Sequence, residues 1–291
     1  MAEHAHLFPI KKMSQVFNVS RSGYYGWLGR PPSKRAIENQ CLREDIRRIW
    51  EGSEQRYGSP RIHQKLLADG WKVSRQRVAR LMRAMGMASC IRRTWVKTTD
   101  SAHRWPVALN LLNRRFNPGQ LGRVWVSDIT FIRGRQGWLY LTAVIDLADR
   151  QVIGWALSRT MEAEKTSIAA LQQALGKRSP SDDGLMFHSD QGSQYACSDF
   201  TDLLGKHGIT QSMSRKGNCW DNAPAESFFK TLKAELGMPE PYETYRQARN
   251  AIFQFIEIWY NRKRLHSSLN YRTPVQMQDY LMQQLEQQQA A

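Results

Sequence analysis

The apolar positions of the first ninety residues recur every three or four residues, which is the spacing of one buried face of an α-helix. Residues 13–28 predict two short helices, the second capped by Ser20, before the prolines of residues 30–33 break the chain. Residues 59–86 show the same pattern more clearly, with a turn at Gly70. The first part of the chain is therefore predicted to be all helical.

The last helix of this region combines an apolar face with a basic face. Ser74 is its predicted N-cap. Its predicted buried positions are Val78, Leu81, Met82 and Met85, and its predicted outward cations are Arg75, Arg77, Arg80 and Arg83. The pair of helices matches a helix-turn-helix, whose second helix lies in the major groove of DNA. A plain helical hairpin with solvated arginines produces the same pattern, so the motif is a hypothesis.

From residue 122 the pattern changes to strands. Three strand-like runs, at 122–134, 137–150 and 151–158, are separated by short turns, which is typical of an antiparallel meander. The segments that follow are predicted as helix 161–177, strand 184–190, helix 197–208, strand 209–215, and helices 222–236 and 242–264. This order predicts an α/β fold, in which helices cover a mixed sheet.

The positive charge of the chain is concentrated before the strands begin. The 291 residues carry a formal net charge of +16. Residues 1–120 hold 23 Lys and Arg against 8 Asp and Glu, whereas residues 121–291 hold 19 against 18. A concentrated positive field favours a polyanion, most often a nucleic acid. The chain has neither an apolar run long enough to span a membrane nor a secretory signal, so we expect a cytoplasmic, nucleoid-associated protein without a membrane partner.

Three carboxylates stand out against this basic background. Strand alternation places Asp128 on the same face as Val124 and Val126, with Trp125 and Ser127 on the outer face, and a carboxylate among apolar neighbours needs a cation or hydrogen-bond donors. Asp190 ends the strand 184–190, and Glu226 lies early in the helix 222–236. Lys230 and Lys233 lie on the same helix face as Glu226. Three oxygen ligands from two strands and one helix suit Mg²⁺.

Four motifs carry a family resemblance: "WVSDITFI", "HSDQGSQY", "NCWDNAPAESFFKTLK" and "YNRKRLHSSLNYRTP". Together they resemble the DDE transposases of bacterial insertion sequences, over about residues 46–276. Thirty-five residues separate Asp190 from Glu226, and Lys233 follows the glutamate by seven, as in that family. Ser127 stands where the family usually has threonine. The resemblance implies a ribonuclease-H-like core, as in retroviral integrases, preceded by a basic, all-helical helix-turn-helix region.

The resemblance also implies the chemistry and the partners. Two Mg²⁺ ions, with Mn²⁺ as a substitute, are expected to promote cleavage and strand transfer at the element ends by in-line phosphoryl transfer, without a covalent protein–DNA intermediate. Asp128 bridges the ions, and Asp190 and Glu226 each hold one. The expected DNA contacts outside the helix-turn-helix are Lys230, Lys233, Asn222, Arg264 and His266. For Asn222, a helix cap is the favoured alternative, and a structural histidine is at least as good an interpretation of His188 as a phosphate contact.

The family resemblance further implies an assembly on DNA. A homo-oligomer is expected to bind element ends and target DNA. The chain lacks leucine-zipper heptads, so it is expected to be the product of a downstream, catalytic reading frame. The chain is then expected to act either alone or in a fusion or partnership with the product of an upstream frame. The expected division is a helical arm with a possible helix-turn-helix at 1–35, a helix-turn-helix region at 36–100, a basic linker at 101–118, the catalytic core at 119–276 and a Gln-rich tail at 277–291.

Three other interpretations remain open from the residues alone. A tyrosine recombinase would use Tyr260 or Tyr271 with Arg264 and His266, but it leaves the carboxylates unexplained. A ribonuclease or junction resolvase could share the fold, and a non-enzymatic regulator could use only the N-terminal helices. Within the transposase interpretation, Asp146 and Asp221 are possible substitute ligands, although structural roles are favoured for both.

Overall fold

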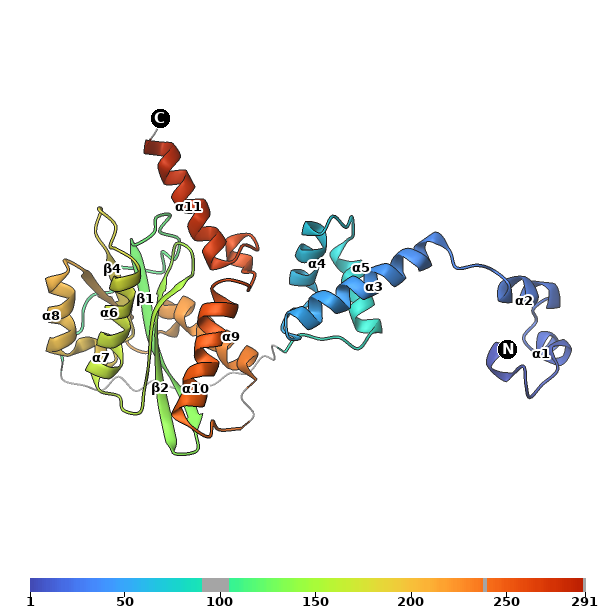
Figure 1. Ribbon diagram of the computed structural model, residues 1–291, viewed down its shortest axis with the longest axis horizontal. Helices are drawn as coiled ribbons and strands as arrows, with labels where there is room; N and C mark the ends of the chain where they lie inside the picture. The colour runs from blue at the N-terminus through green and yellow to red at the C-terminus, as the bar shows by residue number, and fades with distance from the viewer. Residues whose placement is uncertain (91–104, 238–239, 290–291) are drawn as a thin grey trace. The chain divides into compact units, whose positions relative to one another are not determined.

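The computed structural model describes residues 1–90, 105–237 and 240–289 (Figure 1). It divides into two compact units, Met1–Ala88 and Ser89–Ala291. Residues 91–104, which include parts of the predicted helix-turn-helix region and linker, lie outside the described residues, as do the last two residues of the predicted tail.

The N-terminal arm contains the two short helices that the pattern predicted. They are α1 (Ile10–Val16) and α2 (Arg21–Leu28), preceded by the 3₁₀ turn η1 (Ala2–His4). The Ser20 side chain caps α2 by accepting a hydrogen bond from the Gly23 N–H at 3.0 Å. The prediction of this helix pair and its cap is confirmed.

The rest of the first unit is a three-helix cluster. It consists of α3 (Lys34–Gly52), α4 (Ser59–Ala68) and α5 (Arg75–Ala84). Ser74 caps α5 by accepting from the Arg77 N–H, as predicted. The core consists of Leu42 and Ile46 from α3, Ile62 and Leu66 from α4, and Val78, Leu81 and Met82 from α5. The apolar pattern predicted α4 and α5 but not α3, whose few buried positions are spread among charged residues.

The second unit is built on a five-stranded sheet with the order β3-β2-β1-β4-β5. The antiparallel meander is confirmed: β1 (Val124–Gly134) pairs with β2 (Gly137–Asp146), and β2 pairs with β3 (Val152–Ser158). Two short strands, β4 (Met186–Ser189) and β5 (Thr210–Met213), extend the other edge parallel to β1. The sheet is therefore mixed, as expected.

Helices cover both faces of this sheet (Figure 1). One face carries α6 (Ser167–Lys177), α7 (Ser193–Ala196) and α8 (Ser198–Lys206), with the 3₁₀ turn η2 (Ala163–Lys165) before them. The other carries α9 (Ala223–Leu236), α10 (Tyr245–Phe253) and the π-helical turn η4 (Gln254–Tyr260). Because of this double coverage, Trp125 and Ser127 are fully buried, so the prediction that they face outward is wrong.

The segments around the core are also ordered. Part of the predicted linker lies against the sheet edge, where the Met213 N–H donates to the Leu109 carbonyl and Leu112 is buried. The Gln-rich tail belongs to a helix, α11 (Pro274–Gln289). Two 3₁₀ turns, η3 (Cys219–Asn222) and η5 (Ser267–Leu269), precede α9 and α11. None of the described helices is long and apolar enough to span a membrane.

Candidate active site

Sheet register brings the two aspartates to neighbouring strands. Val126 of β1 pairs with His188 of β4, so Asp128 and Asp190 each lie two residues further along parallel strands. Each carboxylate accepts one local backbone hydrogen bond: Asp128 Oδ1 from the Ile129 N–H at 2.8 Å, and Asp190 Oδ1 from the Gly192 N–H at 3.0 Å. These bonds orient the side chain of Asp128 inside β1 and that of Asp190 directly after β4.

Glu226 approaches the aspartates from the first turn of α9. Its side chain is about one-third exposed and lies 3.7 Å from Lys230 Nζ, one helical turn later. Lys233, on the same helix, is close enough to Asp128 for its positive charge to favour the ionised carboxylate. Partial desolvation lowers the pKa of Lys233, and the charge of Asp128 opposes that shift. The sequence-predicted set of Asp128, Asp190, Glu226 and Lys233 is thus one electrostatic neighbourhood.

Asp128 has a strongly shifted pKa in this neighbourhood. Desolvation raises it well above its usual value, and the charges of Asp190 and then Glu226 raise it further. A site that opposes its own negative charge binds a cation favourably. However, among the described residues no group of three or more His, Cys, Asp or Glu side chains is placed to hold one metal ion. If an ion binds here, these carboxylates would be its protein ligands, and water or substrate would supply the rest.

Three buried side chains brace the strands that carry the aspartates. Asn222 Nδ2 donates to the Ser127 carbonyl at 2.9 Å, and the hydroxyls of Ser127 and Tyr195 are 2.7 Å apart. Asn222 is only 4% exposed and occupies the N-cap position of α9, but its side chain accepts no capping hydrogen bond and is used instead for the Ser127 carbonyl. His188 is fully buried between the hydroxyls of Ser212 and Ser214, which corresponds to a structural histidine.

The possible substitute ligands, Asp146 and Asp221, are both paired with arginines. Asp146 is fully buried, 2.7 Å from Arg178 Nη1, and accepts from the Gly122 N–H at 2.7 Å. Asp221 is fully buried between Arg114 and Arg215. Their negative charges are already compensated, so both have the structural roles that were favoured.

The two predicted DNA contacts in the motif "YNRKRLHSSLNYRTP" have buried side chains. Arg264 is 4% exposed, and its Nη2 is 2.9 Å from Glu235 Oε1, so its charge is already paired with a buried carboxylate. His266 is 7% exposed and packs edge-to-face on Tyr260. The predicted DNA contacts of these two residues are therefore wrong: they hold the end of the core together. Tyr260 is buried, and its burial raises its pKa to about 12, which does not suit a recombinase nucleophile.

The four arginines of α5 do not all face outward. Arg75, Arg80 and Arg83 are exposed. Arg77 instead forms a two-pronged bond to Glu38 on α3, at 2.9 and 3.0 Å, and donates to Asn39. Its donors are therefore shared with a neighbouring helix, and its DNA contact stays a prediction.

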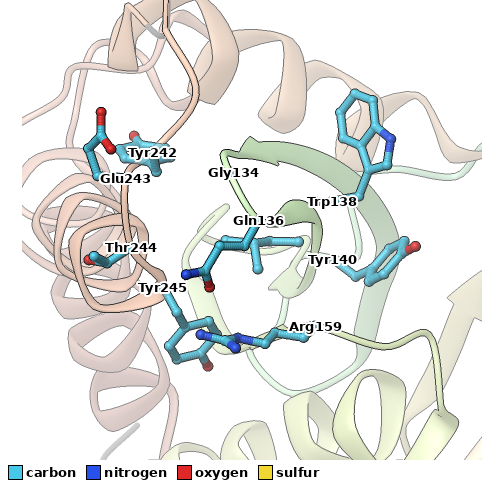
Figure 2. A pocket seen from close by; sticks show the side chains of 11 residues that line it. Gly134, Gln136, Trp138, Tyr140, Arg159, Tyr242, Glu243, Thr244 and Tyr245 are labelled. Carbon is cyan, nitrogen blue, oxygen red and sulfur yellow. The ribbon is translucent and has the colours of Figure 1, made fainter.

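A pocket of about 260 Å³ lies at the far end of the β1–β2 hairpin (Figure 2). Arg159 lies over the ring of Tyr245 there, and Gln136 points into the space between the hairpin and residues 242–245. None of Asp128, Asp190 and Glu226 lines it, so the pocket is separate from the carboxylate site.

Comparison with known families matches both units of this chain. The integrase core domain family matches residues 119–219 and again 207–274, and an HTH-like domain family matches residues 36–95. The mixed five-stranded sheet with flanking helices is that of an integrase catalytic core. The class is therefore a DDE transposase or integrase.

Individual relatives narrow the class. The chain is 39% identical to the 31 kDa protein of insertion element IS600 from Shigella sonnei, over 90% of this chain and 96% of that protein. It is 39% identical to the transposase for insertion sequence element IS904 from Lactococcus lactis (87% and 99% covered), and 37% identical to transposase InsF for insertion sequence IS3A from Escherichia coli (95% and 96% covered). The chain belongs to the family of insertion-sequence transposases with an integrase core domain.

Two solved structures are more distant. One is the simian T-cell lymphotropic virus intasome in complex with PP2A regulatory subunit B56 gamma, at 13% identity and a TM-score of 0.46, with 80% of this chain and 73% of that chain covered. The other is the HTLV-2 integrase catalytic core domain in complex with magnesium, at 15% identity and a TM-score of 0.42, with 54% and 97% covered.

Proposed function

We propose that this transposase cleaves DNA at the ends of its insertion sequence and joins the ends to target DNA by metal-dependent in-line phosphoryl transfer, without a covalent protein–DNA intermediate. The observation that carries the proposal is that Asp128 and Asp190 lie side by side on neighbouring parallel strands, with Glu226 close enough for its charge to raise the pKa of Asp128. The absence of an accessible nucleophilic tyrosine at Tyr260 supports the same choice.

The donor set fits two divalent cations better than one. Asp128, the most strongly perturbed of the three, would be shared, and Asp190 and Glu226 would each complete one site. Mg²⁺ is favoured, with Mn²⁺ as a substitute, because both accept carboxylate, water and phosphate oxygens. When bound, such ions activate the attacking oxygen and stabilise the leaving oxygen. Glu226 must turn from Lys230 toward Asp128, a small rearrangement for a partly exposed side chain.

The lysines of α9 have a separate role in this proposal. Lys233 and Lys230 contact phosphates beside the scissile bond, and Lys233 also offsets the charge of Asp128 when no cation is bound. A solvated lysine on a helix surface is the simpler alternative for Lys230, which lies at the exposed side of the helix.

The first unit supplies most of the affinity for DNA. We infer that α5 lies in a groove, with Arg75, Arg80 and Arg83 toward the DNA. The active form is a homo-oligomer on two element ends. It acts alone or with the product of an upstream reading frame, as a fusion or a partner.

Arg80, which is exposed, and Arg77, which is paired with Glu38, give a matched test of the DNA interface. Arg80→Met should weaken duplex binding and make its dependence on salt less steep by about 0.9 in the log–log slope. Arg77→Met should chiefly lower stability, because Arg77 joins α5 to α3. Equal salt slopes for wild type and Arg80→Met would show that α5 does not face the DNA.

The catalytic proposal is tested with oligonucleotide duplexes carrying an element end. Asp128→Asn, Asp190→Asn and Glu226→Gln should each abolish cleavage and joining in Mg²⁺ while duplex binding persists. Asp146→Asn is the comparison, because Asp146 serves the fold through Arg178. Wild-type joining by any of the first three variants would remove that residue from the ligand set.

A further inference from the structure

Two arginines meet over one buried aspartate just before the helix that carries Glu226. Asp221 Oδ1 accepts from Arg114 Nε at 2.8 Å, and Arg215 donates from Nε and Nη2 to the two carboxylate oxygens, both at 2.8 Å. Asn110 Nδ2 adds a further bond at 2.8 Å. Charge-assisted bonds of this number hold the pKa of Asp221 well below its usual range, so the carboxylate stays ionised at any working pH.

The carboxylate is buried, but the two guanidinium groups above it are not. The Arg114 side chain is 44% exposed and the Arg215 side chain 53%, while Asp221 is fully buried. Among the described residues, Nη1 of neither arginine takes part in a hydrogen bond. Each guanidinium group is therefore fixed along one edge and presents N–H donors to solvent from another.

The residues next to this cluster in the sequence are two exposed cations and an exposed aromatic residue. Arg115 and Lys216, the next residues along the chain from each arginine, are exposed. Trp220, beside Asp221, is 61% exposed, an unusual state for an indole with no role at the surface. Exposed cations interleaved with an aromatic side chain are typical of a surface that follows a nucleic-acid backbone.

We propose that Arg114 and Arg215 together bind a phosphodiester group of the DNA backbone, and that Asp221 holds both guanidinium groups in position for it. Two guanidinium groups share a single carboxylate, which leaves one positive charge uncompensated. A phosphate supplies the missing negative charge, and guanidinium donors match its oxygens in geometry. Because the arginines are already fixed, binding costs little side-chain entropy.

The site has a fixed relation to the catalytic carboxylates. Asn222, the residue after Asp221, donates to the carbonyl of Ser127, the residue before Asp128. Glu226 follows Asp221 by five residues, which corresponds to about 8 Å along a helical segment. A phosphate bound by the arginine pair therefore lies within a few nucleotides of the phosphate at the carboxylates. The inference rests on the proposed function in one respect, that DNA reaches the catalytic unit.

An ordinary structural ion pair is the competing explanation, since the same bonds fasten residues 110–114 to the core. The two explanations differ in the measurement that each affects. Loss of a structural pair lowers the melting temperature and leaves the salt dependence of DNA binding unchanged. Loss of a phosphate contact removes a released counterion, so the log–log slope of affinity against salt becomes less steep by about 0.9 per contact.

The test uses the full chain and a duplex of arbitrary sequence, followed by fluorescence anisotropy at increasing KCl. Because the pair binds one phosphate, Arg114→Met, Arg215→Met and the double variant should each make the slope less steep by about 0.9. Lys206→Met is the matched control, because Lys206 is an exposed cation of α8, on the opposite face of the sheet from α9. The melting temperature of every variant is recorded, so that only folded protein is compared.

Slopes of the two arginine variants equal to the wild-type slope would overturn the proposal, as would an equal change in Lys206→Met. Cleavage of an element-end duplex in Mg²⁺ is measured alongside. If the arginine variants show the expected change in slope but the wild-type protein does not cleave, the proposed function alone is contradicted. A protein that cleaves normally while both arginine variants keep the wild-type slope contradicts the phosphate site alone.

Discussion

The side chain of Asn222 donates a hydrogen bond to the main-chain carbonyl of Ser127, at 2.9 Å in the buried centre of the catalytic unit. Ser127 immediately precedes Asp128, and Asn222 immediately precedes the helix of Glu226. One hydrogen bond therefore joins the strand of the first carboxylate to the helix of the third. It fixes their separation in a way that neither element could achieve by itself.

Asn222→Ala is accordingly expected to reduce cleavage strongly and to leave duplex binding nearly unchanged. The buried carbonyl of Ser127 loses its donor, which should lower the free energy of unfolding by about 1–3 kcal/mol. Cleavage of an element-end duplex and urea unfolding are the two measurements. Ser127→Ala is the matched control, because it removes the bond to Tyr195 but keeps the main-chain carbonyl. If the control loses as much cleavage as Asn222→Ala, the Asn222 bond has no special part in placing Glu226.

His188 should make the protein sensitive to mild acid. Burial lowers its pKa from 6.5 to about 4. The unfolded chain therefore takes up a proton on this histidine as the pH falls through 6.5, whereas the native protein does so only near pH 4. The stability that depends on neutral His188 is fully present above pH 6.5 and is lost between the two values. The loss should amount to about 2 kcal/mol between about pH 7.5 and about pH 5.

The measurement is urea unfolding of wild type and His188→Gln at both pH values. Asp149 works in the opposite direction: burial raises its pKa to about 6, so its contribution to stability grows as the pH falls below that value. Because Asp149 is present in both proteins, the difference between them isolates His188. The gap between wild type and variant should shrink at the lower pH. A gap that is the same at both pH values would mean that His188 is not held neutral.

Arg264 should matter for stability and not for DNA. Its partner, Glu235, is buried and also accepts a bond from the Trp259 indole at 2.7 Å. Arg264→Met leaves that carboxylate buried beside an apolar side chain, which should lower the free energy of unfolding by about 3–5 kcal/mol. The double variant Glu235→Leu with Arg264→Met should recover much of this loss. A folded Arg264→Met protein with a less steep salt slope of DNA binding would return Arg264 to the DNA interface.

Local pattern predicted the elements of this protein better than its long-range pairings. Strand alternation was enough to predict the meander, because it depends on residues close together in the chain. The carboxylate set was predicted from the quoted motifs and their family resemblance, and it stays a prediction. Pairings between distant residues carry no such signal. Arg114 lies 107 residues from Asp221, and Arg264 lies 29 residues from Glu235.

For that reason the sequence assigned Arg264 and His266 to DNA, although they are buried. An arginine or histidine in the sequence does not by itself show whether its partner is a DNA phosphate or a carboxylate of the protein. The sequence also missed the arginine pair over Asp221, for which the only local signal was an aspartate next to an exposed tryptophan. The sequence also did not predict that both faces of β1 are buried. Alternation was interpreted as one buried and one outer face, whereas helices cover the sheet on both sides.

The metal proposal makes a prediction about stability as well as activity. Desolvation and the neighbouring carboxylates raise the pKa of Asp128, so its ionised form opposes folding at neutral pH. That penalty is present above the native pKa and is relieved as the pH falls through it.

Asp128→Asn removes the charge, and the metal-free variant should therefore melt at a higher temperature than metal-free wild type. Mg²⁺ should raise the melting temperature of wild type increasingly as its concentration exceeds the Kd, and leave that of Asp128→Asn almost unchanged. Asp146→Asn is the control, since its partner is Arg178, and it should lose stability while keeping the response to Mg²⁺. A metal-free Asp128→Asn protein that is less stable than wild type, or one that Mg²⁺ stabilises equally, would show that the charge of Asp128 is compensated within the protein and does not await a cation.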